Sequence, residues 1–318
     1  MAEAIDALDS AFLEEAKGHV HQPQRLNMPA PEAGKSFLRI GACVMSESGW
    51  MGFKAMNLAK NVGVRYQVHL YSLADGALRA IMDAQYLTTL RTGATSGVAT
   101  KRLASLRPGK VAVLGAGQEA LMQLEAMRTL GVVSRAEIFS PTVQKREALA
   151  EFFRNSHGMN VTAVDSAQSA ITDADIVVAA VNAAEPVIRG EWLKPGVHVN
   201  SVGTARPTQR EIDSDVFRRA ATVVVDTRNG VFTESGDCLA SLDVIKPEQA
   251  FELSELVAGS APSRRNGSEI TLFKSVGTAV QDIAVAARIF QFAEAKGLGT
   301  RLANFPYVLE KHVNKPYH

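Results

Sequence analysis

The sequence predicts an α/β fold in which a doubly wound parallel sheet is combined with a second domain that contains antiparallel strands. Residues 111–127 place an apolar run, a glycine turn and an amphipathic pattern in the order strand, turn, helix. Further apolar runs follow between 136 and 226, as expected of parallel strands buried on both faces. Residues 36–73 contain short aromatic or β-branched runs separated by turn signals, which predicts an antiparallel meander.

Two helices are predicted before the glycine turn. Residues 2–17 carry apolar side chains at helical spacing and end near Gly18. Residues 79–105 form a long helical pattern rich in Ala, Thr and Gly, which leads almost directly into the strand at 111. Their small side chains let a ligand or a neighbouring backbone approach this second helix closely.

The elements after the glycine turn alternate between strands and helices. We expect strand 136–140, helix 143–155, strand 161–165, a short helix, strands 175–181, 197–202 and 222–226, and a last helix from about Thr278 to Gly297. Because the last helix follows the strands of the parallel sheet, we expect it to return to the first domain.

The glycine turn has the composition of a dinucleotide-binding turn, GxGxxA. Gly115 permits the tight turn, Gly117 lets the backbone approach a pyrophosphate, and Ala120 lets the helix pack tightly on the strand. The phosphates would face the free N–H groups at the start of the helix. The strand before the motif and the helix after it are the context that the motif requires.

The segment after the second strand of the parallel sheet is expected to meet the adenosine ribose. An NAD-binding protein has an Asp or Glu there, whereas this chain has Ser140, Thr142, Lys145 and Arg146. Hydroxyl and cationic side chains suit a 2′-phosphate. The sequence therefore favours NADP(H) as the cofactor, with NAD(H) as the alternative.

Three cationic residues in the first domain are candidates for binding an anion. Arg25 lies between two prolines, Lys54 lies within an apolar strand, and Arg91 lies among small residues in the middle of a helix. Each also fits a solvated surface position; the residues alone favour that position for Arg25 and leave both interpretations open for Lys54 and Arg91. His19 and His21 lack further ligands at metal-binding spacing, so we predict no metal site.

The composition excludes several classes of function. The net charge of +1 gives no electrostatic basis for binding nucleic acid or an anionic membrane. No apolar run is long enough to span a membrane, and no signal peptide is evident. Two cysteines in 318 residues do not form a disulfide framework. We therefore expect a cytoplasmic protein with a small-molecule ligand.

The motifs together resemble those of the ornithine cyclodeaminase and mu-crystallin family over essentially the whole chain. The resemblance is carried by QPQR at 22–25, GFK at 52–54, LTTLRTGATSGVATKRLA at 87–104, VLGAGQEA at 113–120, LKPGVHVNSVGTARP at 193–207, ESGD at 234–237 and TLFKSVGTAVQD at 271–282. It implies a homodimer. It also implies that residues 105–279 form an NAD(P)-binding Rossmann domain, inserted into an α+β substrate-binding and dimerisation domain made of residues 1–104 and 280–318.

The same resemblance implies roles for individual residues. A small amino or imino acid would bind with its carboxylate on Arg25, Lys54 and Arg91, with Lys54 and Arg91 as the candidate catalytic residues. Thr92, Gly115, Ala116, Gly117 and Gln118 would contact the cofactor phosphates, and Ser275 would lie near the nicotinamide. The match begins a little inside the usual start of the family, which implies either an absent first strand or a misplaced start of the chain.

One departure from the family bears on the reaction. The cyclodeaminases and related alanine dehydrogenases have an aspartate that acts on the substrate amine, and Ala205 occupies the matching position here. Without this carboxylate, deprotonation of an ammonium group lacks its obvious general base. The string GTARP at 203–207 instead resembles the ketimine reductases.

The sequence therefore predicts an NAD(P)H-dependent reductase of a small imine or ketimine carboxylate. An ornithine cyclodeaminase or an amino-acid dehydrogenase of the alanine type is the alternative within the same class. A cofactor-dependent ligand-binding protein like mu-crystallin is the alternative from another class.

Overall fold

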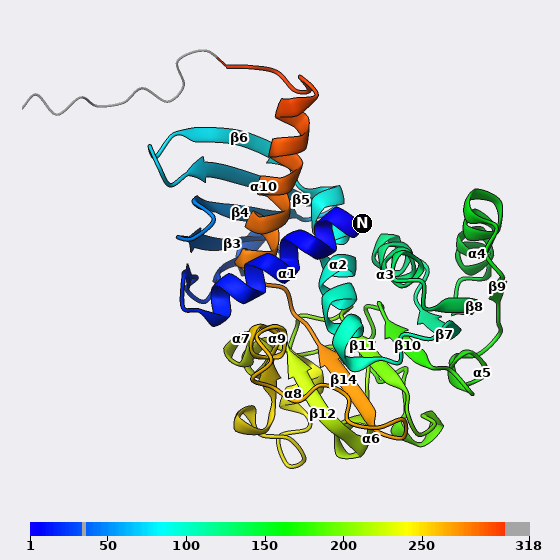
Figure 1. Ribbon diagram of the computed structural model, residues 1–318. Coiled ribbons are helices and arrows are strands. Elements are labelled where there is room, and N and C mark those ends of the chain that lie inside the picture. Colours follow the sequence, from blue (N-terminus) through cyan, green and yellow to red (C-terminus); the bar gives the residue numbers. More distant parts are fainter. Residues whose placement is uncertain (34–35, 303–318) are drawn as a thin grey trace, which may run out of the picture.

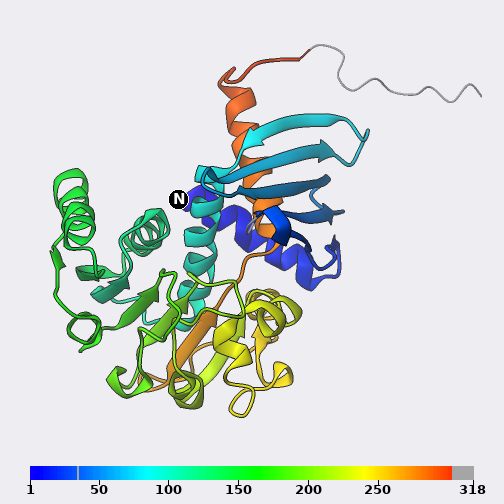
Figure 2. The same cartoon turned by 180° about the vertical axis from the view of Figure 1, so that it is seen from behind.

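The computed structural model describes residues 1–33 and 36–302, which form two β-sheets and the helices around them (Figure 1). The antiparallel sheet lies in the upper part of Figure 1 and the parallel sheet in the lower part, and helix α2 runs between them. The view from behind in Figure 2 shows the same arrangement.

The antiparallel sheet confirms the predicted meander and extends it at both ends. Its strands are β1 (Val20–His21), β2 (Leu26–Ala30), β3 (Ser36–Met45), β4 (Trp50–Ala59), β5 (Gly63–Ser72) and β6 (Leu78–Asp83). They are ordered β1-β3-β4-β5-β6, and β2 also pairs with β3. A 3₁₀ helix, η1 (Pro31–Ala33), lies between β2 and β3.

The predicted start of the long helix at residue 79 is wrong. Leu78–Asp83 form an edge strand in which half-buried and exposed residues alternate, and helix α2 (Gln85–Leu103) begins only after Ala84. The side chain of Asp83 accepts a hydrogen bond from the N–H of Gln85 and so satisfies one free donor at the helix start. Pairing with β5 decides the conformation of this segment, whose composition is compatible with either structure.

Three helices share one hydrophobic core with the antiparallel sheet. Helix α10 (Ala279–Ala295) lies across β3, β4 and β5, and α1 (Ala2–Ala16) packs against α10 and α2 (Figure 1). Leu8, Phe12 and Ile283 are completely buried in this core. The two predicted terminal helices are confirmed, and the last one returns to the antiparallel sheet as expected.

The second sheet has eight parallel strands, in the order β13-β12-β14-β11-β10-β7-β8-β9. Their bounds are β7 (Gly109–Leu114), β8 (Val133–Phe139), β9 (Val161–Ala163), β10 (Ile176–Ala179), β11 (His198–Ser201), β12 (Ala220–Val225), β13 (Phe251–Glu252) and β14 (Ile270–Lys274). The helices between them are α3 (Gln118–Thr129), α4 (Val143–His157), α5 (Ala167–Ile171), α6 (Ser214–Arg219), α7 (Arg228–Glu234), α8 (Gly236–Leu239) and α9 (Leu253–Val257), with the 3₁₀ helices η2 (Gly190–Trp192) and η3 (Pro247–Gln249).

Both faces of the parallel sheet are buried, as the continuous apolar runs predict. Val111 and Val113 of β7 belong to one hydrophobic core, whereas Ala112 and Leu114 belong to another. Because successive side chains of a strand point to opposite faces, the two cores lie on opposite sides of the sheet. The predicted doubly wound architecture is therefore confirmed.

The chain passes twice between the two sheets. Helix α2 leads from the antiparallel sheet into β7, and β14 leads from the parallel sheet into α10 (Figure 1). Strands β7 and β10 are neighbours, with β8 on one side and β11 on the other, which is the arrangement of a topological switch point. Ligands of such sheets bind beyond the carboxyl ends of the strands at this point.

No helix in residues 1–33 and 36–302 is long and apolar enough to cross a membrane.

Candidate active site

A cavity of about 420 Å³ lies between the antiparallel sheet and the carboxyl ends of the parallel strands. It is lined by residues of β3 and β4, of the start of α2, and of the loops that follow β11 and β14. Of the residues predicted to form the site, Arg25, Lys54, Arg91, Thr92 and Ser275 line this cavity together. They come from segments far apart in the sequence, and the two-sheet architecture brings them together.

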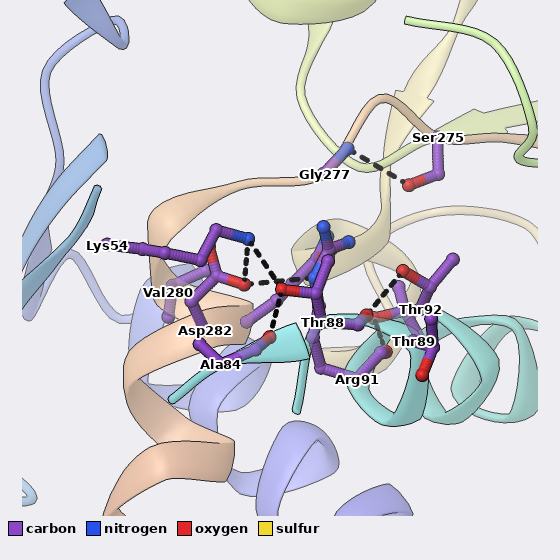
Figure 3. Close-up of polar contacts among 12 residues, drawn as sticks. Lys54, Ala84, Thr88, Thr89, Arg91, Thr92, Ser275, Gly277, Val280 and Asp282 are labelled. Atoms are coloured by element: carbon purple, nitrogen blue, oxygen red, sulfur yellow. Dashed lines mark hydrogen bonds and ion pairs between the residues drawn. The ribbon is translucent and has the colours of Figure 1, made fainter. Parts of the chain in front are cut away.

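Lys54 and Arg91 converge on the carboxylate of Asp282 (Figure 3). Nζ of Lys54 lies 2.7 Å from Oδ1 of Asp282, and Nε of Arg91 lies 3.0 Å from the same oxygen. Lys54 projects from β4, Arg91 from α2 and Asp282 from the first turn of α10. One carboxylate thus compensates two buried cations, and the three groups together keep one positive charge.

The environment of Lys54 changes its acidity. Burial lowers the pKa of Lys54, Asp282 raises it, and the charge of Arg91 lowers it; together these effects leave the pKa at about 8. Nζ also lies 3.4 Å from the hydroxyl oxygen of Thr88 and faces the ring of Tyr66. An ammonium with such a pKa releases its proton far more readily than an ordinary lysine side chain.

Arg91 is held from two sides and leaves one nitrogen available. Its Nη1 donates to the side-chain oxygen of Gln281, and its Nη2 makes no hydrogen bond with any described residue. The guanidinium lies directly against Gly277, where a Cβ would come within 2.7 Å of Nη1. Gly277 also has φ +82°, in the left-handed region. Glycine is therefore required here by both the backbone conformation and the approach of Arg91.

Asp226 fixes the loop that carries Ser275 and Gly277. Its Oδ2 accepts hydrogen bonds from the hydroxyl of Ser275 at 2.7 Å and from the N–H of Gly277 at 2.6 Å. The same oxygen accepts from Gln281, the residue that positions Arg91. A buried carboxylate at the end of β12 thus holds both the loop and, through Gln281, the guanidinium of Arg91.

Arg25 lies in the cavity but is already paired. Its Nε and Nη2 donate to the carboxylate of Glu234, and its Nη1 donates to the carbonyl oxygens of Val276 and Gly277. This arrangement is a two-pronged contact between a guanidinium and a carboxylate. Arg25, which the sequence predicts as one of three carboxylate-binding cations, thus already donates to a carboxylate of the protein, whereas Nη2 of Arg91 makes no hydrogen bond with any described residue.

The glycine turn has the geometry that a dinucleotide requires. Gly115 has φ +117°, and a Cβ there would come within 2.4 Å of the carbonyl oxygen of Ala180. A Cβ at Gly117 would meet no atom within 4 Å, so the space in front of the turn is open. Gly117 is the N-cap of α3, and no side chain caps this helix. The first N–H groups of α3 thus face open space and fit a pyrophosphate.

Glu119 lies in the first turn of the same helix and lines the cavity. Burial raises its pKa, and the cations of Arg91 and Lys54 partly offset this effect. Its Oε2 is buried without a hydrogen-bond partner among the described residues. This carboxylate therefore lies in the cavity close to the start of α3, which the sequence motif did not indicate.

The predicted ribose-binding residues lie outside the cavity, at the end of β8 and the start of α4. Thr142, the N-cap of α4, is exposed, and so is Lys145. The guanidinium of Arg146 is buried instead, where it donates to the carbonyl oxygen of Ser140 and to the carboxylate of Asp165. Arg146 thus stabilises the end of β8 in the described structure.

Ala205 lines the cavity, in the loop after β11. A fully buried ion cluster lies beneath this loop, in which Nζ of Lys274 is 2.8 Å from Asp237 and 3.4 Å from Glu211. Glu211 accepts a hydrogen bond from the N–H of Gly203, and Asp237 accepts one from the N–H of Glu211. Asp237, in the first turn of α8, is therefore part of a structural network.

Sequence reasoning missed several charged residues of the cavity, among them Asp282 and Arg39. It also missed Asp226, which is not among the lining residues but holds the loop of Ser275 and Gly277. Asp282 could have been found, because it is a carboxylate among apolar residues in the first turn of a buried helix. Asp226 directly follows a continuously apolar strand, at the end of the sheet where ligands bind. Arg39 has no comparable signal. Among the described residues, no group of three or more His, Cys, Asp or Glu side chains could hold a metal ion.

Comparisons with known proteins give a consistent result. The model of the ornithine cyclodeaminase/mu-crystallin family matches residues 1–297. The chain is 34% identical to a Delta(1)-pyrroline-2-carboxylate reductase of Bacillus cereus over 289 residues, which cover 88% of this chain and 85% of the relative. It is 34% identical to the ketimine reductase mu-crystallin of Mus musculus over 224 residues, 70% of this chain and 68% of the relative.

Solved structures agree with this assignment. The fold matches that of a Thermococcus litoralis Delta(1)-pyrroline-2-carboxylate reductase in complex with NADH and L-proline, with a TM-score of 0.90 and 33% identity over 95% of this chain and 96% of the other. It also matches an archaeal alanine dehydrogenase dimer with bound NAD, with a TM-score of 0.88 and 28% identity over 96% and 95% of the two chains. This chain belongs to the ornithine cyclodeaminase/mu-crystallin family.

Proposed function

We propose that this protein is an NAD(P)H-dependent reductase of a small imine carboxylate, most simply a cyclic imino acid, and that it transfers hydride to the C=N carbon. The observation that carries the proposal is the convergence of Lys54 and Arg91 on Asp282, in a cavity next to the dinucleotide-type glycine turn. Relatives that act as pyrroline-2-carboxylate and ketimine reductases support it.

The substrate carboxylate would bind at Arg91 and Lys54. Nη2 of Arg91 is available for a charge-assisted hydrogen bond, and the excess positive charge of this group matches one carboxylate. Arg25 would remain paired with Glu234 and contribute as a third cation at longer range. Fixed groups around a bound carboxylate orient the imine without further rearrangement.

A bound reduced nicotinamide would supply the hydride, and Lys54 would supply the proton. The ammonium of Lys54 gives a proton to the imine nitrogen, which makes the carbon more electrophilic, and Asp282 stabilises the protonated lysine before this step. The product is the corresponding amino acid. Atoms and charges balance, because the imine takes up one hydride at carbon and one proton at nitrogen.

Ala205 favours reduction over deamination. The methyl group of Ala205 lies at the cavity wall in place of the aspartate that the cyclodeaminases and alanine dehydrogenases use. An alanine offers no base for removing a proton from an ammonium group or for activating water. An imine needs neither step, because it arrives as an electrophile.

The cofactor would bind along the start of α3. Its phosphates would lie at the backbone of Gly115, Ala116, Gly117 and Gln118 and at the hydroxyl of Thr92, with the nicotinamide near Ser275. We propose NADP(H) as the preferred form. With Arg146 bound to Asp165, this preference depends on Ser140, Thr142 and Lys145, whereas the two relatives of known structure named above bind NADH and NAD.

We further propose that residues 1–104 and 280–318 form the substrate-binding and dimerisation domain and residues 105–279 the NAD(P)-binding domain, with 303–318 outside the described residues.

A homodimer would form through the face of the antiparallel sheet that α10 does not cover. The paired residues Ala42, Phe53, His69 and Ile81 lie in one row on this face, where Phe53 and His69 stack at 4.6 Å and Ile81 is 49% exposed. The dimeric alanine dehydrogenase supports the proposal.

The test is an assay of the purified protein with NADPH and with NADH against pyrroline-2-carboxylate and piperideine-2-carboxylate. We expect oxidation of the cofactor that depends on the imine, and about 10²-fold or greater loss in Arg91→Ala. Ammonia release from ornithine, or NAD reduction by alanine, without imine reduction would contradict the proposal. Tight NADPH binding without turnover of any candidate would instead support a ligand-binding protein.

A further inference from the structure

A second cationic position lies in the cavity, one step along the sheet from Lys54. In the pairing of β3 with β4, Gly41 faces Lys54 and Arg39 faces Met56, and all four residues line the cavity. Residues two apart on a strand share a face and lie about 7 Å apart. The backbone of Arg39 is therefore displaced by about this distance, along the strand, from that of Gly41, the residue that pairs with Lys54.

The guanidinium of Arg39 is incompletely partnered. Its Nε donates to the side-chain oxygen of Asn27, but Nη1 and Nη2 make no hydrogen bond with any described residue. Nη2 lies 4.0 Å from Oε2 of Glu234, too far for a hydrogen bond. Both oxygens of Glu234 already accept hydrogen bonds from Arg25. The carboxylate of Glu234 is thus hydrogen-bonded to Arg25, and Arg39 lies near it without a hydrogen bond.

Burial increases the need for a counter-ion at Arg39. Its side chain is only 21% exposed, and burial and the charge of Arg25 lower its pKa to about 10. It is still protonated at neutral pH. Arg206 also lines the cavity and acts on Arg39 with the same sign of charge. A charged group that is largely removed from water without a full partner is costly, and an anionic ligand would supply the missing partner.

We propose that Arg39 binds a second carboxylate at the far end of the substrate side chain, so that among open-chain imines that of a short 2-oxo dicarboxylic acid is preferred over that of a monocarboxylic acid of equal length. This inference rests on the proposed function, which places the first carboxylate of the substrate at Arg91 and Lys54. The two free nitrogens of Arg39 match the two oxygens of a carboxylate in a fork-like contact. The separation along the sheet fits two carboxylates joined by a short carbon chain.

The test compares two substrates of equal chain length in wild type and in Arg39→Leu. The imines form in solution from ammonium and 2-oxoglutarate or 2-oxopentanoate, which differ by the distal carboxylate. We expect wild type to have the higher kcat/KM with the dicarboxylate, and Arg39→Leu to lower the ratio of the two kcat/KM values about 10- to 100-fold. Arg79→Leu is the matched control, because Arg79 lies on β6 in an exposed ion pair with Asp75 and should leave the ratio unchanged.

A wild-type preference for the monocarboxylate, or an equal loss with both substrates in Arg39→Leu, would overturn the proposal. If neither open-chain imine is reduced, the assay with the cyclic imines still decides on the proposed function, and the anion site is tested separately by ligand binding. Calorimetry with glutarate and pentanoate in the presence of NADPH then decides. Tighter binding of glutarate that is lost in Arg39→Leu supports the site, and equal binding of the two acids refutes it.

Discussion

Lys54 and Asp282 form a buried ion pair, with 2.7 Å between Nζ and Oδ1, and this pair joins the antiparallel sheet to the helix that follows the last strand of the parallel sheet. The carboxylate stabilises the charged form of Lys54 against burial. The balance between these two opposing effects leaves the pKa at about 8, within the range in which an enzyme exchanges protons at neutral pH.

The rate of imine reduction should therefore fall as the pH rises through about 8. Lys54 is protonated below this pH and can donate, whereas above it the neutral amine cannot. Because one side chain loses one proton, its contribution to the limb should have the slope of one proton. The measurement is kcat/KM against pH from 6 to about 10 at saturating cofactor.

The variant Lys54→Arg distinguishes the loss of a proton from Lys54 from the loss of a proton from the imine substrate. A guanidinium keeps its proton throughout the range, so Lys54→Arg should lower the rate about 10²-fold or more and remove the enzyme's alkaline limb. The imine titrates identically with both enzymes. A limb that stays near pH 8 in Lys54→Arg would assign it to the substrate and contradict the role of Lys54.

Gly277→Ala should disturb the position of Arg91. A Cβ at this position would lie 2.7 to 3.0 Å from the guanidinium atoms, so Arg91 must move, and we expect kcat/KM for the imine to fall about 10- to 100-fold. Gly76→Ala is a matched control, because Gly76 also has a positive φ of +69° but has no atom within 4 Å of the added Cβ.

Both substitutions should cost about 1–2 kcal/mol of unfolding free energy through backbone strain, as measured by chemical denaturation. Only Gly277→Ala should also lose activity. Equal activity in the two variants would show that the contact between Gly277 and Arg91 has no catalytic consequence.

Glu119→Gln should strengthen cofactor binding, most clearly at alkaline pH. Burial raises the pKa of Glu119, so as the pH rises above its ordinary range the wild-type carboxyl becomes charged and repels the phosphates. We expect about 3- to 10-fold tighter binding of NADPH in the variant at pH 8, by titration of the cofactor fluorescence. Glu125→Gln, on the outer part of the same helix and paired with Arg128, should leave the affinity unchanged. Weaker binding in Glu119→Gln would mean that this side chain accepts a hydrogen bond from the cofactor.

The parts of the structure that depend on local pattern could be predicted from the sequence. The glycine turn, the strands buried on both faces and the two terminal helices follow from short-range periodicity, because burial on one or two faces has a regular spacing along the chain. The edge strand at Leu78–Asp83 could not be distinguished from the following helix, because only its pairing with β5 decides its conformation.

The partners of the site residues depend on contacts between distant segments and could not be predicted. Nothing near Lys54 or Arg91 in the sequence indicates that both would meet Asp282, which lies 228 residues after Lys54 and 191 residues after Arg91. In the same way, the sequence next to Arg25 does not show that Glu234 would occupy its guanidinium. The family resemblance identified the three cations, and the structure identified the carboxylates of Asp282 and Glu234 that pair with them.

Lys274→Met should strongly destabilise the protein. It leaves the carboxylates of Glu211 and Asp237 fully buried without their cation, and we expect a loss of about 3–5 kcal/mol in the unfolding free energy. Lys194→Met removes a partly exposed ion pair with Asp175 and should cost less than about 1 kcal/mol.

The pH dependence of the stability of Lys274→Met gives a second readout. Burial already raises the pKa of Glu211, and loss of Lys274 would raise it further. Above the ordinary pKa of a glutamate, the folded variant therefore keeps a proton on Glu211 that the unfolded chain has released. Its stability should therefore fall more steeply than that of wild type as the pH rises from about 5 to 8. Denaturation curves at the two pH values measure this difference, and an equal loss at both would show that the cluster acts through packing rather than through charge.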